Sequence, residues 1–154
     1  YVEIDSGATG NVVSIGWRST RLRTTHNNML IIPNSKLVES IVTNFHGPAM
    51  ELAVIVESGV SYSSDLVFVE QVALEVAREV IEDLPEAVKS REPWFGFDTF
   101  GDSNINFWVW LYASDRIGSF RVRSEVIKRL HARFAKEGIV INYPVRLLTY
   151  ENPE

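Results

Sequence analysis

The sequence predicts an α+β protein in which a small five-stranded β-barrel precedes a β-α-β-β-α-β unit and a C-terminal strand. Short apolar segments separated by turn residues recur about every 8 to 12 residues up to Phe45. Beyond Pro48, two helical apolar stripes alternate with strand-like runs. We therefore expect a barrel domain over residues 1–46, an α/β domain over 49–138, and a strand with a tail over 139–154.

The expected barrel has turns at Ser6-Gly7 and Asn27-Asn28, between short strands. Pro33 has no N–H for a ladder, so we expect it to end its strand. Asn34 or Ser35 should then N-cap a brief helical turn. A unit this small buries little apolar surface, so we expect neighbouring domains or subunits to stabilise it. Its strands are expected at 2–5, 11–17, 20–25, 29–33 and 41–45.

The period changes after the linker His46-Gly47-Pro48. Met50, Leu52, Val54 and Val56 alternate as one face of a strand. A helix capped by Ser64 and stopped by Pro85 should follow, and then two strands, 94–101 and 104–113, joined by a turn at Asp102-Ser103.

A second helix is expected over 115–137, with Phe120, Ile127, Leu130 and Phe134 on its buried side and Gly138 as its C-cap. Residues 139–141 complete the pattern as a last strand. The order β-α-β-β-α-β is the ferredoxin-like arrangement.

Composition narrows the function classes. The chain has 154 residues, 45% of them hydrophobic and 23% charged, which is an ordinary globular balance. It contains no cysteine, which excludes disulfides and thiolate metal sites. Its net charge of -5 argues against a nucleic-acid binder. The longest apolar runs, such as 52–56, fall far short of the ~20 residues that span a bilayer.

The sequence offers no catalytic pattern. His26, His46 and His131 lack the spacing of a metal site, and no serine sits in a nucleophile elbow. Gly7 to Gly10 lacks the Lys-Ser/Thr tail of a phosphate-binding loop. We expect no enzyme activity, no metal and no cofactor.

Thirteen residues between positions 10 and 44 fall at the spacings of a known pattern: Gly10, Val12, Ile15, Arg18, Thr20, Leu22, Arg23, Ile32, Pro33, Asn34, Leu37, Ile41 and Asn44. This pattern resembles the first cytosolic domain of small-conductance mechanosensitive channels. His26 departs from it, since the family more often has Asp at this turn. The resemblance implies structural roles for seven of these residues, namely Gly10, Arg18, Thr20, Arg23, Pro33, Asn34 and Asn44.

The resemblance continues into the second unit through residues 103–107 and Gly138-Ile139, although Asn142 replaces a proline of the family pattern. It implies the cytosolic vestibule of a homoheptameric channel in the cell (inner) membrane. Such a channel opens under membrane tension and passes ions and small solutes on hypo-osmotic shock. The pore-lining helices would lie outside this chain, which by itself would be a soluble cytosolic part.

Two surface features call for a partner. Trp108, Trp110 and Tyr112 alternate with aliphatic residues, so they should stand on the open face of the sheet, which a monomer rarely leaves wet. With Ile139 and Ile141 of the last strand they are candidate subunit contacts.

The first helix is acidic and the second basic. We favour pairing between the two helices, and the alternative, that these charges line a cavity or join subunits, stays open.

One other function is compatible with the barrel. Sm-like barrels also occur in RNA-binding rings, and Arg18, Arg21 and Arg23 are basic. A soluble oligomeric RNA-binding or scaffold protein is therefore the alternative hypothesis, although the acidic total counts against RNA.

Overall fold

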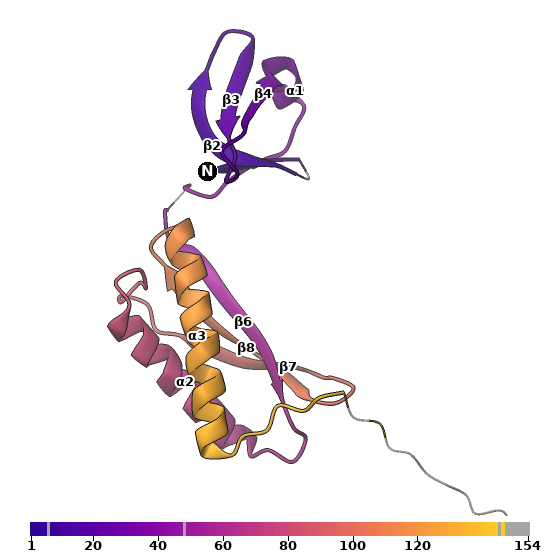
Figure 1. The fold of residues 1–154 in the computed structure, drawn as a ribbon, viewed down its shortest axis with the longest axis vertical. Helices are drawn as coiled ribbons and strands as arrows, with labels where there is room; N and C mark the ends of the chain where they lie inside the picture. Colours follow the sequence, from indigo (N-terminus) through magenta and orange to yellow (C-terminus); the bar gives the residue numbers. More distant parts are fainter. Residues whose placement is uncertain (6, 48, 145, 147–154) are drawn as a thin grey trace, which may run out of the picture. The chain divides into compact units, whose positions relative to one another are not determined.

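The computed structural model describes residues 1–5, 7–47, 49–144 and 146. The chain divides into two compact units, Tyr1–Leu52 and Ala53–Glu154 (Figure 1). This division lies just beyond the linker that the sequence indicated. The expected boundary at 46–49 and the separate tail over 139–154 stay predictions.

The first unit is a five-stranded sheet with one short helix. Its neighbouring strands, in the order β4-β3-β2-β1-β5, pair antiparallel, so the last strand returns to lie beside the first. β2 pairs with β1 through its first half and with β3 through its second, and the β2–β3 register shifts between Val12 and Ser14. The elements are β1 (Val2–Ile4), β2 (Ala8–Ile15), β3 (Ser19–Arg23), β4 (Met29–Pro33), α1 (Asn34–Val38) and β5 (Val42–Asn44).

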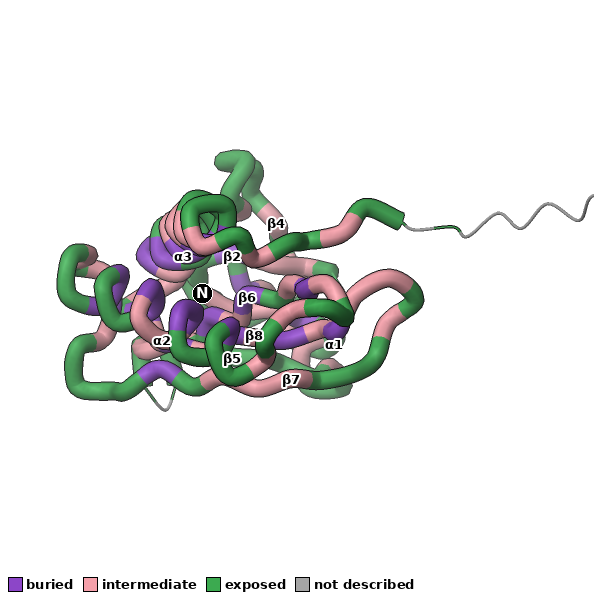
Figure 2. Tube along the Cα trace, turned by 90° about the horizontal axis from the view of Figure 1, so that it is seen from below, coloured by how far each residue is buried: buried purple, intermediate pink, exposed green. Residues whose placement is uncertain are grey.

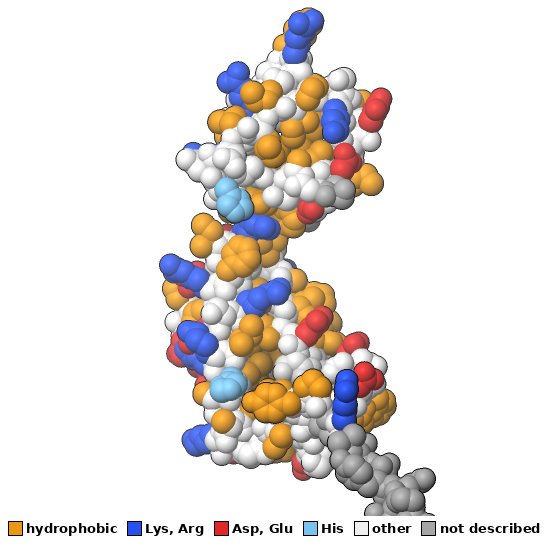
Figure 3. All heavy atoms as spheres, turned by 45° about the vertical axis from the view of Figure 1, so that its right-hand side comes forward, with side chains coloured by type: hydrophobic (Ala, Val, Ile, Leu, Met, Phe, Trp, Pro, Cys, Tyr) orange, Lys and Arg blue, Asp and Glu red, His pale blue; other side chains and the backbone are white. Residues whose placement is uncertain are grey.

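The core of the first unit is small. Ile4 of β1 and Leu22 of β3 are its buried apolar residues among those described, and Thr20 of β3 is also buried. Many of its other large apolar side chains are exposed, including Ile15, Ile31 and Ile41. Hydrophobic atoms accordingly show on the surface in Figure 3. This unit leaves apolar surface for neighbours to cover.

The second unit packs two helices against one face of a three-stranded sheet of order β6-β8-β7. One core cluster joins Val54 of the sheet to Val76 and Val126 of the helices. Figure 2 colours such buried positions purple along α2, α3 and β8. The elements are β6 (Leu52–Val60), α2 (Leu66–Asp83), β7 (Trp94–Phe100), β8 (Ile105–Ala113) and α3 (Arg116–Glu137).

Both predicted N-caps are wrong. Asp65, not Ser64, caps α2, because its carboxylate accepts hydrogen bonds from the backbone N–H groups of Val67 and Phe68. At α1 the cap position belongs to Pro33, with no side-chain capping bond. Asn34 makes other hydrogen bonds, described below.

The buried side of α3 was only half predicted. Leu130 and Phe134 are buried as expected, but Phe120 and Ile127 are 61% and 51% exposed. Val122 and Val126 take their places in the core. The helix ends as predicted at Gly138, whose φ of 71° is left-handed.

The predicted last strand at residues 139–141 is absent. The backbone N–H of Ser61 donates to the Val140 carbonyl, but side chains make the next bonds. The Asn142 N–H donates to Asn104 Oδ1 at 3.0 Å, and Asn104 Nδ2 donates back to the Asn142 carbonyl at 3.2 Å. Because side-chain amides replace ladder bonds here, the segment follows the sheet without joining it as a strand.

Candidate functional site

Two family-motif residues of the first unit, Thr20 and Asn34, are joined through their side chains. The buried Thr20 hydroxyl donates to Asn34 Oδ1 at 2.9 Å. The amide nitrogen of Asn34 donates to the carbonyls of Gly16 and Trp17 at 2.9 and 3.2 Å. The Asn34 backbone N–H donates to the Arg18 carbonyl at 2.9 Å. We call Thr20, Asn34 and these three carbonyl groups the Asn34 lock, since they fasten the β2–β3 turn to the start of α1.

Three other motif residues shape the course of the backbone. Gly10 is required by close packing, because a Cβ there would lie 2.7 Å from the carbonyl oxygen of Arg23. Pro33 ends β4 opposite Ser19, in keeping with its missing N–H. Asn44 ends β5 and accepts a hydrogen bond from the His46 N–H at 3.0 Å, which forms a turn at the linker.

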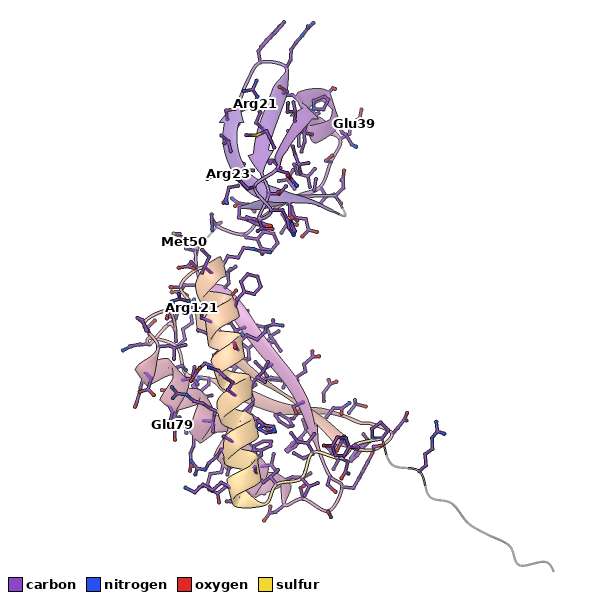
Figure 4. All side chains as sticks on the ribbon, viewed as in Figure 1. Arg21, Arg23, Glu39, Met50, Glu79 and Arg121 are labelled. Atoms are coloured by element: carbon purple, nitrogen blue, oxygen red, sulfur yellow. The ribbon has the colours of Figure 1, made fainter. Side chains whose placement is uncertain are left out.

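The three arginines of the first unit are exposed. Arg18 lies over the ring of Trp17, 5.5 Å from its centroid, and Trp17 is itself 90% exposed. Arg21 and Arg23, labelled in Figure 4, project from the same side of β3 because they are two residues apart. Within the described residues, no hydrogen bond or ion pair engages the Arg23 guanidinium.

Trp108, Trp110 and Tyr112 of β8 lie on the open sheet face, as the alternation predicted. Odd positions of β8 from Ile105 to Ala113 are buried, whereas Trp108, Trp110 and Tyr112 are half-buried. The Trp108 ring lies over Gly96, where a Cβ would come within 2.5 Å of it. Opposite Trp110 on β7 is Trp94, which is 69% exposed. Of the other candidate contacts, Ile139 packs partly on the core and Ile141 is 43% exposed.

Two surfaces of the second unit escaped the sequence reasoning. A cavity of about 370 Å³ on the open sheet face is lined by Glu57 of β6, Asp98 of β7, and Asn106 and Trp108 of β8. The pairing of the three strands brings these residues together, and no local sequence pattern predicts that pairing. The other surface is the exposed stripe Ile117, Phe120 and Ile127 of α3. Ile127 lies seven residues before the buried Phe134, on the same side of the helix, so helical periodicity does not separate the two.

The two helices pair their charges as we favoured from the sequence. Arg129 bonds Asp83 at 2.6 Å, and Arg133 bonds Glu75 at 2.9 Å. Arg121 of α3 reaches Glu86, beyond the end of α2, at 2.5 Å. Figure 4 labels Arg121, and also Glu79, which lies 3.7 Å from Arg133.

These contacts shift the pKa values of the paired groups. A hydrogen bond from Gln71, aided by Arg133, holds the pKa of Glu75 below its ordinary value. The Arg121 guanidinium lowers the pKa of Glu86, and Lys128 together with Arg129 lowers that of Glu125. The bond to Glu137 raises the pKa of Arg133. All the shifts stabilise the charged forms, which marks a structural network of ion pairs.

The described residues hold no group of three or more His, Asp or Glu side chains arranged to bind a metal ion. His26, His46 and His131 lie apart, on the β3–β4 turn, after β5 and on α3. Within the same residues no helix is long and apolar enough to cross a membrane.

Comparison with protein families matches both units in the same order along the chain. Residues 1–47 match the β-domain of mechanosensitive ion channels, and residues 54–141 match the C-terminal domain of the MscS mechanosensitive ion channel. The chain belongs to the MscS family of mechanosensitive channels. This is a family of channels, not of enzymes, and it does not favour the RNA-binding alternative.

Curated MscS relatives extend the match over nearly the whole chain. An uncharacterised MscS family protein of Archaeoglobus fulgidus is 32% identical over 98% of this chain and 51% of its own length. The small-conductance mechanosensitive channel of Helicobacter pylori is 30% identical over 81% of this chain and 44% of its own. The chain thus spans about half the length of the curated relatives it matches.

Solved structures share the fold. The crystal structure of Helicobacter pylori MscS in its closed state superposes with a TM-score of 0.82 and 26% identity, over 96% of this chain and 56% of that one. Arabidopsis thaliana MSL1 superposes with a TM-score of 0.67 at 17% identity over 91% of this chain and 51% of that one, which shows the likeness of fold alone. This mixed α/β architecture therefore resembles the cytoplasmic region of MscS-family proteins.

Proposed function

We propose that this MscS-family chain forms the cytosolic vestibule of a mechanosensitive channel that opens under membrane tension and releases ions and small solutes on hypo-osmotic shock. The observation that carries the proposal is the ordered match of both cytosolic family domains, supported by the likeness to closed Helicobacter pylori MscS over 96% of the chain. The remainder of the protein, in the cell membrane, supplies the pore.

The finer architecture is part of the same proposal. The first unit is an Sm-like barrel, since its five antiparallel strands return β5 to the side of β1. The second unit is ferredoxin-like up to α3, and it lacks the final strand as described above. Seven copies assemble in a ring, and Trp108, Trp110, Tyr112, Ile139 and Ile141 lie at or near subunit contacts. In support, Trp94 on the open sheet face is 69% exposed, and Tyr143 in the segment after α3 is 87% exposed.

In this assembly the described motif residues are structural. The Asn34 lock and Gly10 hold the small first unit in shape, because its own apolar core is too slight to do so. Arg18 and Arg23, which point to solvent, are available to bond a neighbouring copy or the membrane-embedded part.

The test uses the full-length protein that contains this chain, in a bacterial strain without mechanosensitive channels of its own. We expect survival of a sudden hypo-osmotic shift, and currents gated by suction in excised membrane patches. A variant with Asn34→Asp should weaken both, whereas Ser35→Asp, a neighbouring exposed position, should not. Full-length protein that reaches the membrane but gives neither survival nor tension-gated current would contradict the proposal.

A further inference from the structure

The second unit carries two uncovered surfaces on opposite sides of its two layers. One is the open face of the sheet, because α2 and α3 cover only the other face. The second is the stripe Ile117, Phe120 and Ile127 on α3, which is 73%, 61% and 51% exposed. These residues lie at i, i+3 and i+10, on one side of the helix, turned away from Val122 and Val126 in the core.

The sheet surface carries unpaired acid beside an aromatic ring. Glu57 and Asp98 line the 370 Å³ cavity with Asn106 and Trp108. In the described part of the chain neither carboxylate has an ion pair or a hydrogen bond. Arg91, at the far end of this face, lies over the ring of Tyr112 at 4.4 Å. A cation that entered the cavity would meet two carboxylates beside the Trp108 side chain, a favourable setting for a guanidinium.

The α3 stripe carries a matching cation. Arg123 is exposed, three residues after Phe120 and four before Ile127, so it borders the stripe. Among the described residues it has no acidic partner, unlike Arg121, Arg129 and Arg133. Arg116, with its guanidinium 5.6 Å from the ring centroid of Phe120, adds to the basic character.

Charge also indicates which helix, α2 or α3, is the better partner for the open sheet face. The exposed side of α2 carries Glu70, Glu79 and Glu82, which would repel Glu57 and Asp98. The exposed side of α3 offers apolar residues and Arg123. The acidic sheet face therefore complements α3.

We propose that the Ile117–Phe120–Ile127 stripe of one copy docks on the open sheet face of a second copy, with Arg123 entering the Glu57–Asp98 cavity. The inference rests on the proposed function, because it names the surfaces through which vestibule subunits meet. Since the two surfaces differ and lie on opposite sides of the unit, each copy binds two neighbours head to tail. Such a heterologous contact closes into a ring, whereas an isologous contact would stop at a dimer.

Because this chain contains no cysteine, disulfide crosslinking can be tested with cysteines introduced at chosen positions. Ser58→Cys places a thiol at the cavity, and Ser124→Cys places one on α3 between Phe120 and Ile127. Under mild oxidation the double variant should form a ladder of covalent oligomers. An equal mixture of the two single variants should stop at dimers, and each single variant alone should stay monomeric.

The same variants are also oxidised in membranes that carry the full-length protein, with any other cysteines replaced, so that assembly does not depend on the fragment. Crosslinking of either single variant with itself in both settings would overturn the proposal, because it indicates an isologous contact. No ladder from the double variant, with a large oligomeric mass by light scattering, would also overturn it but leave the proposed channel function intact.

Charge reversal gives a second readout. Arg123→Glu should raise the subunit dissociation constant about tenfold or more, and adding Glu57→Arg should restore much of the loss. Lys136→Glu, the same charge change near the C-terminal end of α3, is the matched control and should leave association unchanged. Unaltered circular dichroism would establish that the variants fold. Equal weakening by Arg123→Glu and Lys136→Glu, or no restoration, would contradict the docking.

Discussion

At the residue scale, Asn34 shows why a polar side chain can define a small fold. Its amide accepts from Thr20 and donates to two carbonyls, so one side chain satisfies both the turn and the strand beside it. The sequence pattern marked Thr20 and Asn34 as structural but assigned Asn34 to a helix cap. The cap prediction failed because the β2–β3 turn, 17 and 18 residues away, offers the amide its partners.

We predict that Asn34→Asp lowers the free energy of unfolding by about 1 to 3 kcal/mol, because a carboxylate cannot donate to the Gly16 and Trp17 carbonyls. Urea denaturation followed by circular dichroism measures the change. Ser35→Asp adds the same charge at the next, exposed position and should cost little. Equal stability of the two variants would show that the lock contributes nothing.

Gly10 gives a second residue-scale prediction. Gly10→Ala puts a methyl group 2.7 Å from the Arg23 carbonyl oxygen, so we expect a loss of about 1 to 3 kcal/mol through the forced separation of β2 and β3. Gly7→Ala is the matched control, since a Cβ at Gly7 meets no atom within 4 Å. Thermal unfolding of both variants measures the difference. An unchanged midpoint for Gly10→Ala would argue against close packing of the two strands.

At the element scale, α3 joins three surfaces of different character. Its buried stripe packs in the core, its arginines pair with acidic residues of α2, and the stripe Ile117, Phe120 and Ile127 is exposed. The sequence showed an abundance of apolar residues and arginines along this segment. We expected Phe120 and Ile127 in the core, but the segment has more apolar residues than the core can hold. Only the packing of the two helices decides which of them are buried.

The ion pairs between α2 and α3 should make stability depend on acidity. The pKa of Glu75 is lowered in the folded chain, so its contribution is fully present above the ordinary value of 4.5 and is lost as the pH falls through the lower folded value. Arg133→Gln removes one cause of this shift and should flatten the fall in stability as the pH drops below the ordinary pKa of 4.5. The flattening should be partial, since the hydrogen bond from Gln71 remains.

Unfolding by urea at a series of pH values measures this slope. Arg123→Gln removes a charge from the same helix at a position without an acidic partner in the described residues, so it should leave the slope unaltered. A slope that is the same for Arg133→Gln and for the natural chain would mean that the pairing is too weak to affect folding.

At the scale of the whole molecule, the two units differ in how completely each buries its apolar side chains. The large core cluster lies wholly within residues 54–139, whereas the first unit has little more than Ile4 and Leu22. The second unit therefore has the apolar burial to fold alone, and the first depends more on hydrogen bonds and neighbours.

We predict that residues 53–154 produced alone unfold cooperatively at the same temperature as in the whole chain, while residues 1–52 alone are marginally stable. Calorimetry and two-dimensional NMR spectra of the three proteins measure this. A large fall in the unfolding temperature of residues 53–154 would show that the units stabilise each other.

The sequence by itself determined the order of the elements, the five short strands, the breaks at Pro33, Pro85 and Gly138, and the channel family through the motif from Gly10 to Asn44. These features are local, because periodicity, turn chemistry and motif spacing act within a few residues. Tertiary structure alone decided the bonds of Asn34, the gathering of Glu57, Asp98 and Trp108, and the loss of the last strand to the Asn104–Asn142 pair. Each joins residues far apart in the chain, and nothing in the neighbouring sequence fixes such a contact until the strands are in register.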